Sequence, residues 1–175
     1  TYPAEATSTS DPRNSKTGEN VEVTGADKTP AMPKYVFDEG NENNVLSGTV
    51  KADNSLVLKV YFKKQFTVIY KPGAHGTFEE QKTEGLDYNA DTPAFEGEPA
   101  GEDGYTFKGW DPDPAAKVTE DATYVAKWEA NDATYKVEYY YQGADGTYPA
   151  EATSTSDPRN SKTGENVEVT AEDKN

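Results

Sequence analysis

Apolar and polar residues alternate in short runs along this chain of 175 residues. Alternation with a period of two is typical of β-strands that bury one face, and the clearest case is 55–62, where four apolar side chains share a face. The pattern predicts strands at 20–24, 35–37, 45–51, 55–62, 66–70, 104–110, 122–128 and 135–141. It therefore indicates a β-rich chain with little helix.

Turn-forming residues separate these runs. Asn and Asp tolerate the left-handed backbone region, so 52–54 is predicted to join 45–51 and 55–62 in a hairpin. Residues 1–18 read as a long polar loop or irregular edge. Residues 78–89 are ambiguous between a strand and one or two helical turns. Further predicted turns are 38–44, 72–76 and 111–114.

One stretch of the chain occurs twice without a difference. Residues 1–24 and 147–170 both read TYPAEATSTSDPRNSKTGENVEVT. Shared fold or composition cannot produce such identity, so the sequence predicts a tandem array and an excerpt of a longer protein. The predicted modules are 1–64, which lacks its first strand; 65–130, of a second kind; and, after a linker at 131–134, the N-terminal part of the next module of the first kind at 135–175.

The two joins between the predicted modules differ. Residues 63–65 are a short polar connection between strands and are predicted to be stiff. Residues 129–134 are longer and rich in Ala, Asn and Asp, so a looser join is predicted there. Short sheets joined end to end predict an elongated molecule.

Composition makes the predicted modules small and acidic. Apolar residues are 33% of the chain and the mean hydropathy is −0.95, values that lean towards disorder. The aromatic residues, 11%, lie in the alternating runs, so thin cores with long polar loops fit better. A net charge of −15 argues against nucleic acid or an anionic membrane as partner.

The chain has no cysteine, which excludes disulfides, thiolate zinc sites and cysteine nucleophiles. Secreted eukaryotic modules of this size usually carry disulfides, so their absence favours a bacterial exported protein. No apolar run is long enough to span a bilayer, and no membrane insertion is predicted in this segment.

Few residues are candidates for chemistry. The single histidine, His75, lies in a glycine-rich turn without partners at the spacing of a triad or metal site. A lysine–asparagine isopeptide cross-link through Lys136 or Lys59 is a further alternative. Four acidic residues are candidate calcium ligands, although prolines interrupt them and turn roles are favoured: Asp111, Asp113, Glu120 and Asp121. We predict no enzyme activity, catalytic residue, metal site or cofactor.

Most aromatic residues lie at alternating strand positions, where burial is the default. Stacking of the tryptophans on sugars is the alternative. The predicted core of 65–130 is Tyr105, Phe107, Trp110 and Trp128, packed with Phe66 and Val68. Successive strand residues point to opposite faces, so three tyrosines in a row cannot all be buried. The predicted contact surface is therefore Tyr139, Tyr140 and Tyr141.

Residues 65–130 carry an ordered set of motifs. These are FTVIYKPGAHGTF at 66–78, a loop with Thr-Pro and Glu-Pro, GYTFKGW at 104–110 and ATYVAKW at 122–128. The set resembles the Listeria–Bacteroides repeat, also called the internalin B-repeat, over the whole stretch. The resemblance implies a small β-grasp-like fold that occurs in tandem on bacterial surface proteins.

The flanking residues carry a second set, namely YKVEYYYQGADG at 135–146, TGENVEV at 163–169 and 17–23, and LSGTVKADNSLVLKVYFKK at 46–64. This set is similar to the mucin-binding-protein repeat, although the Ser/Thr/Pro insert at 1–16 departs from that pattern. The resemblance implies a ubiquitin-like β-grasp fold and mucin binding, with many members acting as spacers. The expected class is β-rich α+β, with small β-grasp-like modules in tandem.

Together these features predict a non-enzymatic stalk or spacer of a bacterial cell-surface adhesin. It would be extracellular, anchored to a Gram-positive cell wall through other parts of the parent, and would project a distal binding domain. The alternative is a module that binds mucin glycans or a host protein through exposed tyrosines.

The sequence also predicts that neighbouring copies complete one another. The first module lacks the strand that the second supplies from Tyr135 to Tyr141, and the second lacks the 45–62 hairpin. We expect that strand of one chain to pair with the 20–62 sheet of the next, head to tail, as in donor-strand complementation. Such a contact does not close on itself and would build a filament.

Overall fold

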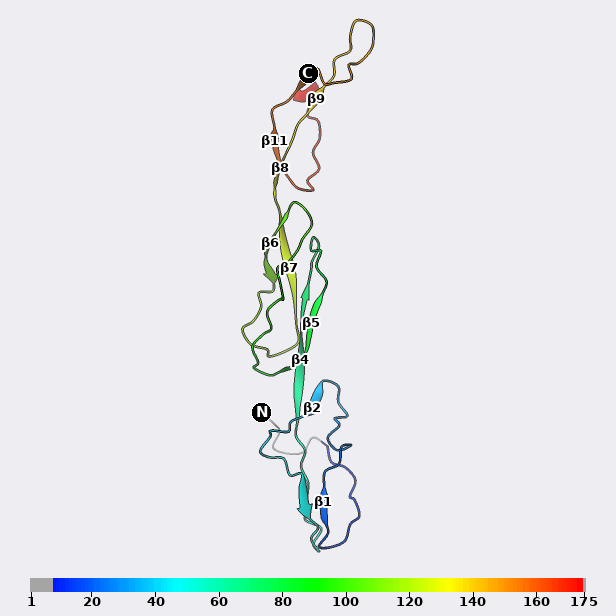
Figure 1. Cartoon of the computed structure of the whole chain (residues 1–175), viewed down its shortest axis with the longest axis vertical. Helices are drawn as coiled ribbons and strands as arrows, with labels where there is room; N and C mark the ends of the chain where they lie inside the picture. The colour runs from blue at the N-terminus through cyan, green and yellow to red at the C-terminus, as the bar shows by residue number, and fades with distance from the viewer. Residues whose placement is uncertain (1–7, 175) are drawn as a thin grey trace. The chain divides into compact units, whose positions relative to one another are not determined.

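β-Strands dominate the structure, a computed structural model that describes residues 8–174 (Figure 1). The chain forms two compact units, residues 1–66 and 67–175, and each is described by itself. The β-rich character predicted from the alternating pattern is confirmed. The helical part of the predicted α+β class is not found: within residues 8–174 the only helix is one 3-10 turn, η1 (Glu172–Lys174).

The first unit pairs short strands around a thin core. β1 (Asn20–Glu22) is antiparallel to β3 (Ser47–Thr49), and β2 (Tyr35–Phe37) is antiparallel to the first residues of β4 (Phe62–Lys71). The rings of Phe37 and Phe62 meet edge to face, with centroids 6.5 Å apart. Among residues 8–66 only Phe66, at the end of the unit, is buried, as expected where surface is large relative to volume.

The predicted hairpin at 45–62 is present only as a turn with one bridge. Asn54 has a left-handed φ of 58°, and Val45 and Lys59 exchange two backbone hydrogen bonds of 2.9 Å. The strand partner of the first arm is β1, not the second arm. Leu56 lies against Gly48, where an added Cβ would be 2.6 Å from Leu56 Cδ1. The second arm therefore packs on the β1–β3 pair and does not extend its ladder.

The second unit is built on a mixed sheet. β4 is parallel to β7 (Ala122–Ala130), β6 (Tyr105–Asp111) is antiparallel to β7, and β5 (Gln81–Asp87) pairs with β4. Phe66, Val68 and Tyr70 are buried at every second position of β4, as the alternation predicted. Parallel neighbours need a long crossover, which here contains β5 and β6. The ambiguous stretch 78–89 contains a strand, β5, and no helix.

Aromatic rings fill the core of the second unit. The ring of Trp110 lies 4.7 Å from that of Tyr70 and 5.2 Å from those of Phe95 and Phe107. The ring of Trp128 lies 5.6 Å from that of Phe107. Both tryptophans and Phe107 are half-buried. The fourth predicted core residue, Tyr105, is also half-buried but stacks on His75, with ring centroids 3.7 Å apart.

The prediction of a linker at 131–134 is wrong, because three of its four residues belong to a strand. Only Asn131 separates β7 from β8 (Asp132–Tyr135), which is antiparallel to β11 (Arg159–Lys162). Asn131 donates its N–H to Gly104 and accepts the N–H of Thr163, over 2.8 and 3.0 Å. Its side-chain oxygen accepts the Thr106 hydroxyl at 2.6 Å. Hydrogen bonds thus lie on both sides of Asn131, and residues 63–65 lie within β4. The predicted difference in flexibility between the two joins stays a prediction.

The strand predicted from Tyr135 to Tyr141 is divided in two and is already paired. β8 ends at Tyr135, and β9 (Glu138–Tyr139) is antiparallel to β10 (Ser154–Thr155). The partners β10 and β11 come from the second copy of the repeat, whose counterpart in the first copy, predicted as a polar loop at 1–18, forms no strand within its described residues 8–18. Backbone groups form these ladders, so an apolar pattern is not required. The expectation that this strand lacks a partner in its own chain is therefore wrong.

Candidate functional site

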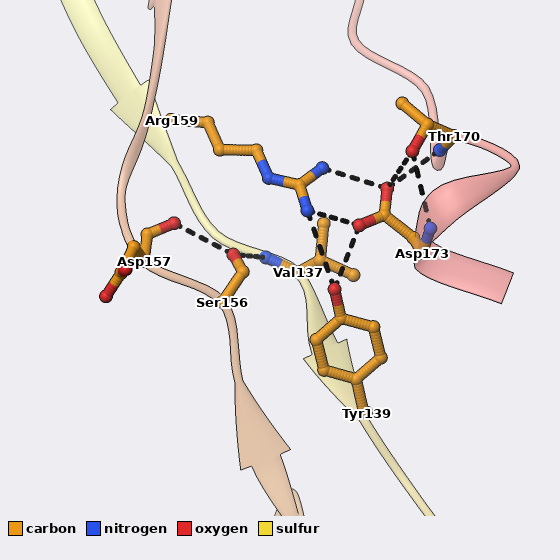
Figure 2. Close-up of polar contacts among 7 residues, drawn as sticks. All are labelled: Val137, Tyr139, Ser156, Asp157, Arg159, Thr170 and Asp173. Carbon is orange, nitrogen blue, oxygen red and sulfur yellow. Dashed lines mark hydrogen bonds and ion pairs between the residues drawn. The ribbon is translucent and has the colours of Figure 1, made fainter. Parts of the chain in front are cut away.

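Four side chains meet at the second copy of the repeat, two from within it and two from the residues on either side of it (Figure 2). Arg159, in β11, contacts both carboxylate oxygens of Asp173, in η1, with Nη1 2.8 Å from Oδ2. Thr170 donates its N–H and its hydroxyl to Asp173 Oδ2, each over 2.8 Å. The hydroxyl of Tyr139, in β9, donates to Asp173 Oδ1 at 2.9 Å. We call these four residues the second lock.

Part of the second lock is formed by two residues that lie close together in the sequence. Thr170 and Asp173 have the spacing of a capping box, in which each side chain bonds the backbone N–H of the other residue. The Asp173 N–H accordingly points to Thr170 Oγ1, 3.4 Å away. The turn thereby presents both carboxylate oxygens to Arg159, whose planar guanidinium suits a two-point contact.

The second lock keeps its carboxylate ionised. The Asp173 side chain is only 1% exposed, yet the Arg159 guanidinium, followed by the Thr170 donors, holds its pKa well below the ordinary value. The hydrogen bond to Asp173 in turn raises the pKa of Arg159 and that of Tyr139 above their ordinary values. Near neutral pH the cluster is a charged clamp that fastens β9, β11 and η1 together.

Backbone contacts hold the strands on either side of the second lock. Ser156 donates its N–H to Val137 O at 2.9 Å. Its hydroxyl oxygen accepts the Val137 N–H at 3.0 Å (Figure 2). The same hydroxyl donates to Asp157 O at 2.9 Å. Thr153 donates its N–H to Tyr139 O at 2.9 Å. Ser156 thus bridges the gap between β8 and β9.

The first copy contains the same lock without the tyrosine. Arg13 contacts both oxygens of Asp27, and Thr24 donates its N–H and its hydroxyl to Asp27 Oδ2 over 2.8 and 2.7 Å. The Arg13 guanidinium, followed by the Thr24 donors, keeps the Asp27 pKa far below its ordinary value. We call these three residues the first lock. The Asp27 side chain is 19% exposed, against 1% for Asp173.

Neither lock was predicted, although the sequence carries a signal for both. The identity of the copies ends at 24 and 170, and the next five residues read GADKT and AEDKN. Only the third and fourth of these positions stay the same, namely Asp27-Lys28 and Asp173-Lys174. The aspartate at the retained position is the residue that completes each lock.

Beside the second lock, two adjoining open hollows lie between residues 135–141 and 167–169, and because they share Val137 and Val169 we call them together the hollow. Its apolar lining includes Val137, Val167 and Val169. Val167 and Val169 are 42% and 51% exposed, although their counterparts Val21 and Val23 in the first copy are half-buried. The hollow is therefore a surface that the same sequence covers elsewhere in this chain.

The predicted tyrosine surface lies partly at this hollow. Tyr140 and Tyr141 are 44% and 63% exposed, whereas Tyr139 is half-buried in the second lock. The Tyr140 hydroxyl donates to Glu138 at 2.8 Å, and this contact raises the Tyr140 pKa. The structure thus brings two exposed rings beside an apolar hollow and assigns the third tyrosine to a structural contact.

The other candidates take structural positions. His75 stacks on Tyr105 with its Nδ1 2.9 Å from a Glu102 carboxylate oxygen. Lys136 and Lys59 are exposed, unlike the buried setting that an isopeptide cross-link needs. Among residues 8–174, no three acidic, histidine or cysteine side chains are grouped as a metal site, so the four acidic candidates are not gathered together. One of them, Asp121, accepts the Thr67 N–H at 2.8 Å.

No protein-family model matches this chain, and neither the comparison with curated proteins nor that with solved structures found a match. The two family resemblances therefore rest on the sequence motifs alone. In the part of the chain that the structure describes, no helix is long and apolar enough to cross a membrane.

Proposed function

We propose that this chain is a non-enzymatic repeat segment of a bacterial cell-surface adhesin, acting as a stalk or spacer that projects a distal binding domain. The observation that carries the proposal is the duplicated lock. The same arginine–aspartate–threonine clamp forms at both copies, with the arginine and threonine inside the identical stretch and the aspartate three residues beyond it, once beside β1 and β3 and once beside β8 to β11. A clamp that recurs with its sequence is what a structural repeat needs.

Further features fit this role. The parallel pair β4–β7, with β5 beside one strand and β6 beside the other, supports a β-grasp-like module in the second unit. The charge of −15 favours solubility and opposes unwanted association between stalks. The bacterial surface location rests on the absence of cysteine together with the two resemblances.

The stalk proposal is tested by solution scattering and glycan arrays on the whole chain. A stalk is expected to give an elongated scattering profile and no saturable glycan signal. A compact profile would contradict it. A saturable signal would move the assignment to the second candidate function.

The second candidate is a binding module for mucin glycans or a host protein. It is favoured by the two exposed rings of Tyr140 and Tyr141 beside the apolar hollow, because aromatic rings with an apolar face and a polar edge suit sugar and protein contacts. Saturable binding lost in Tyr140→Ala with Tyr141→Ala would establish it. The matched control is Tyr88→Ala, an exposed tyrosine of the second unit far along the chain from the hollow.

A further inference from the structure

Two neighbouring strands of the second unit, β4 and β7, run in the same direction. Residues 68–71 of β4 lie opposite residues 122–125 of β7 in a parallel ladder (Figure 1). Because parallel strands point the same way, the chain enters this pair at one end, through β4, and leaves it at the other end, through β7. Tension along the chain therefore slides the two strands past each other and does not peel them apart from one end.

A hydrogen bond between a side chain and the backbone lies beyond each end of this ladder. Where the chain enters, the Asp121 carboxylate accepts the Thr67 N–H at 2.8 Å. At the other end, Trp128 donates its Nε1–H to Pro72 O at 2.7 Å. Asp121 directly precedes β7 and Pro72 directly follows β4, whereas Thr67 and Trp128 lie within the two strands. β4 is thus fastened to β7 on both sides of the four paired positions.

The side chains of the same two strands form most of the buried core. Within the described residues six side chains are buried, and five of these lie on β4 or β7, namely Phe66, Val68, Tyr70, Tyr124 and Ala126. Among the described strands, β1, β3, β8, β9, β10 and β11 contain no buried side chain. Hydrogen bonds are stronger where the surroundings are less polar, so the β4–β7 ladder lies in the most protected part of the chain.

We propose that β4 and β7 form a force-bearing pair that carries tension along the chain. Sliding loads the four paired positions and the two flanking hydrogen bonds together, so that they share the force. A ladder that is peeled from one end bears the force at one position at a time. The proposal deepens the stalk role and rests on it for the source of the tension, because a stalk that holds a bound target is pulled by that target.

Resistance to force differs from resistance to denaturant. Forced unfolding is governed by the rate of unfolding and not by the free energy of unfolding. A unit with a thin core can therefore unfold readily in denaturant and still resist tension along β4 and β7. The direction of the applied force, and not only its size, should decide how strongly this unit resists.

Pulling the same protein in two directions tests the force-bearing pair. The chain has no cysteine, so two introduced cysteines define where the force is applied. Lys64→Cys with Lys127→Cys applies it near the start of β4 and in the second half of β7, which slides the strands past each other. Lys64→Cys with Glu120→Cys applies it at the same end of both strands, which peels them apart. All three side chains are exposed.

The measurement is single-molecule force spectroscopy of the whole chain at one pulling speed. The rupture force should be about two to four times higher in the sliding direction, because four positions share the load there and one bears it in the peeling direction. Equal forces in the two directions, or a higher force in the peeling direction, would overturn the proposal.

Trp128→Phe, added to each cysteine pair, gives a second measurement. It removes the N–H that bonds Pro72 O but keeps an aromatic ring. This bond is loaded at once by sliding but is reached last by peeling from Lys64 and Glu120. The rupture force should therefore fall in the sliding direction and stay unchanged in the peeling direction. An equal fall in both directions would reflect a general loss of stability and would contradict the proposal.

The force-bearing pair and the stalk role can fail separately. A compact scattering profile would contradict the stalk and leave the ratio of the two rupture forces unchanged. Equal rupture forces would contradict the force-bearing pair and leave an elongated scattering profile unchanged.

Discussion

The two copies of the repeat share 24 residues but only part of their structure. At both copies the arginine, threonine and aspartate form the same lock, and the glycine between the arginine and the threonine has a left-handed φ, 85° at Gly18 and 75° at Gly164. The turns also match, because Glu19 and Glu165 each accept a backbone N–H from the lysine three residues before. These contacts lie within 15 residues along the chain, so they form at both copies although the surrounding strands differ.

Strand pairing differs between the copies. Residues 159–162 form β11 against β8, whereas their counterparts 13–16 form no strand. Conversely, β1 pairs with β3, whereas its counterpart 166–168 does not pair. The same sequence is thus a strand or not according to which partner the rest of the chain supplies. The locks and turns are determined by residues that lie close together in the sequence, whereas the strands depend on which partner strand lies beside the repeat.

The largest expected effect is a loss of stability that reaches the second copy of the repeat but not the first. Trp128 packs on Phe107 and donates its Nε1–H to Pro72 O at 2.7 Å, near the end of β7 that leads into β8. Trp128→Ala should cost about 3 kcal/mol, the low end for large aromatic residues, because the ring is half-buried. Hydrogen exchange should then lose protection in β8 and β11 but not in β1.

The matched control is Val125→Ala, an exposed position on the same strand, which should cost less than about 0.5 kcal/mol. If Trp128→Ala reduced protection equally in β1 and β11, the stability of both copies would depend on the same core, and the comparison would fail. A variant that melts with the wild type would show that the indole adds little to the core.

The next effect compares the two locks directly. Arg159→Ala removes the counter-charge of the Asp173 carboxylate, whose side chain is 1% exposed, whereas Arg13→Ala removes that of Asp27, which water reaches more easily at 19%. We expect Arg159→Ala to reduce hydrogen-exchange protection in β11 by a larger factor than Arg13→Ala reduces it in β1. Equal factors would mean that the tyrosine and the flanking strands add nothing to the second lock.

This comparison explains how far the sequence predicts the fold. β4, β6 and β7 were predicted because one face of each packs into a core, buried in β4 and β7 and half-buried in β6, and such packing leaves an alternating pattern. β5, β10 and β11 were missed or ambiguous because they are mostly polar and are held by backbone bonds to neighbours. No reading of residues 13–16 alone could predict a strand, since the identical residues 159–162 form one only beside β8.

The candidate site was predictable in part for the same reason. Three successive tyrosines require an exposed ring, and Tyr140 and Tyr141 are exposed. The role of Tyr139 depends on Arg159 and Asp173, which are distant in sequence, so no local pattern indicates it. The hairpin was misassigned because alternation shows which face of a strand is buried but not which strand is its partner.

A smaller effect tests the contact between Gly164 of the second copy and Tyr105, which the equivalent Gly18 of the first copy lacks. Gly18→Ala meets open space and should cost about 1 kcal/mol from the left-handed backbone alone. An added Cβ at Gly164 would lie 2.7 Å from the Tyr105 hydroxyl oxygen, so Gly164→Ala should cost more. Chemical denaturation measures both. Adding Tyr105→Phe should remove the excess, and an excess that persists would place its cause elsewhere.

The smallest effect is a difference in titration between the two locks. Both aspartates have a pKa depressed mainly by their arginine, so each lock contributes stability above the ordinary carboxyl pKa. That stability is lost as the pH falls towards the folded-state value. Asp173 accepts one donor more than Asp27, the Tyr139 hydroxyl, and should therefore titrate at the lower pH. Carbon-13 NMR of the two carboxyl groups measures the midpoints, or their lower limits where acid unfolding comes first. Tyr139→Phe should raise the Asp173 midpoint and leave that of Asp27 unchanged. If Asp27 titrates below Asp173, or if removing the hydroxyl moves neither midpoint, the tyrosine does not distinguish the second lock from the first.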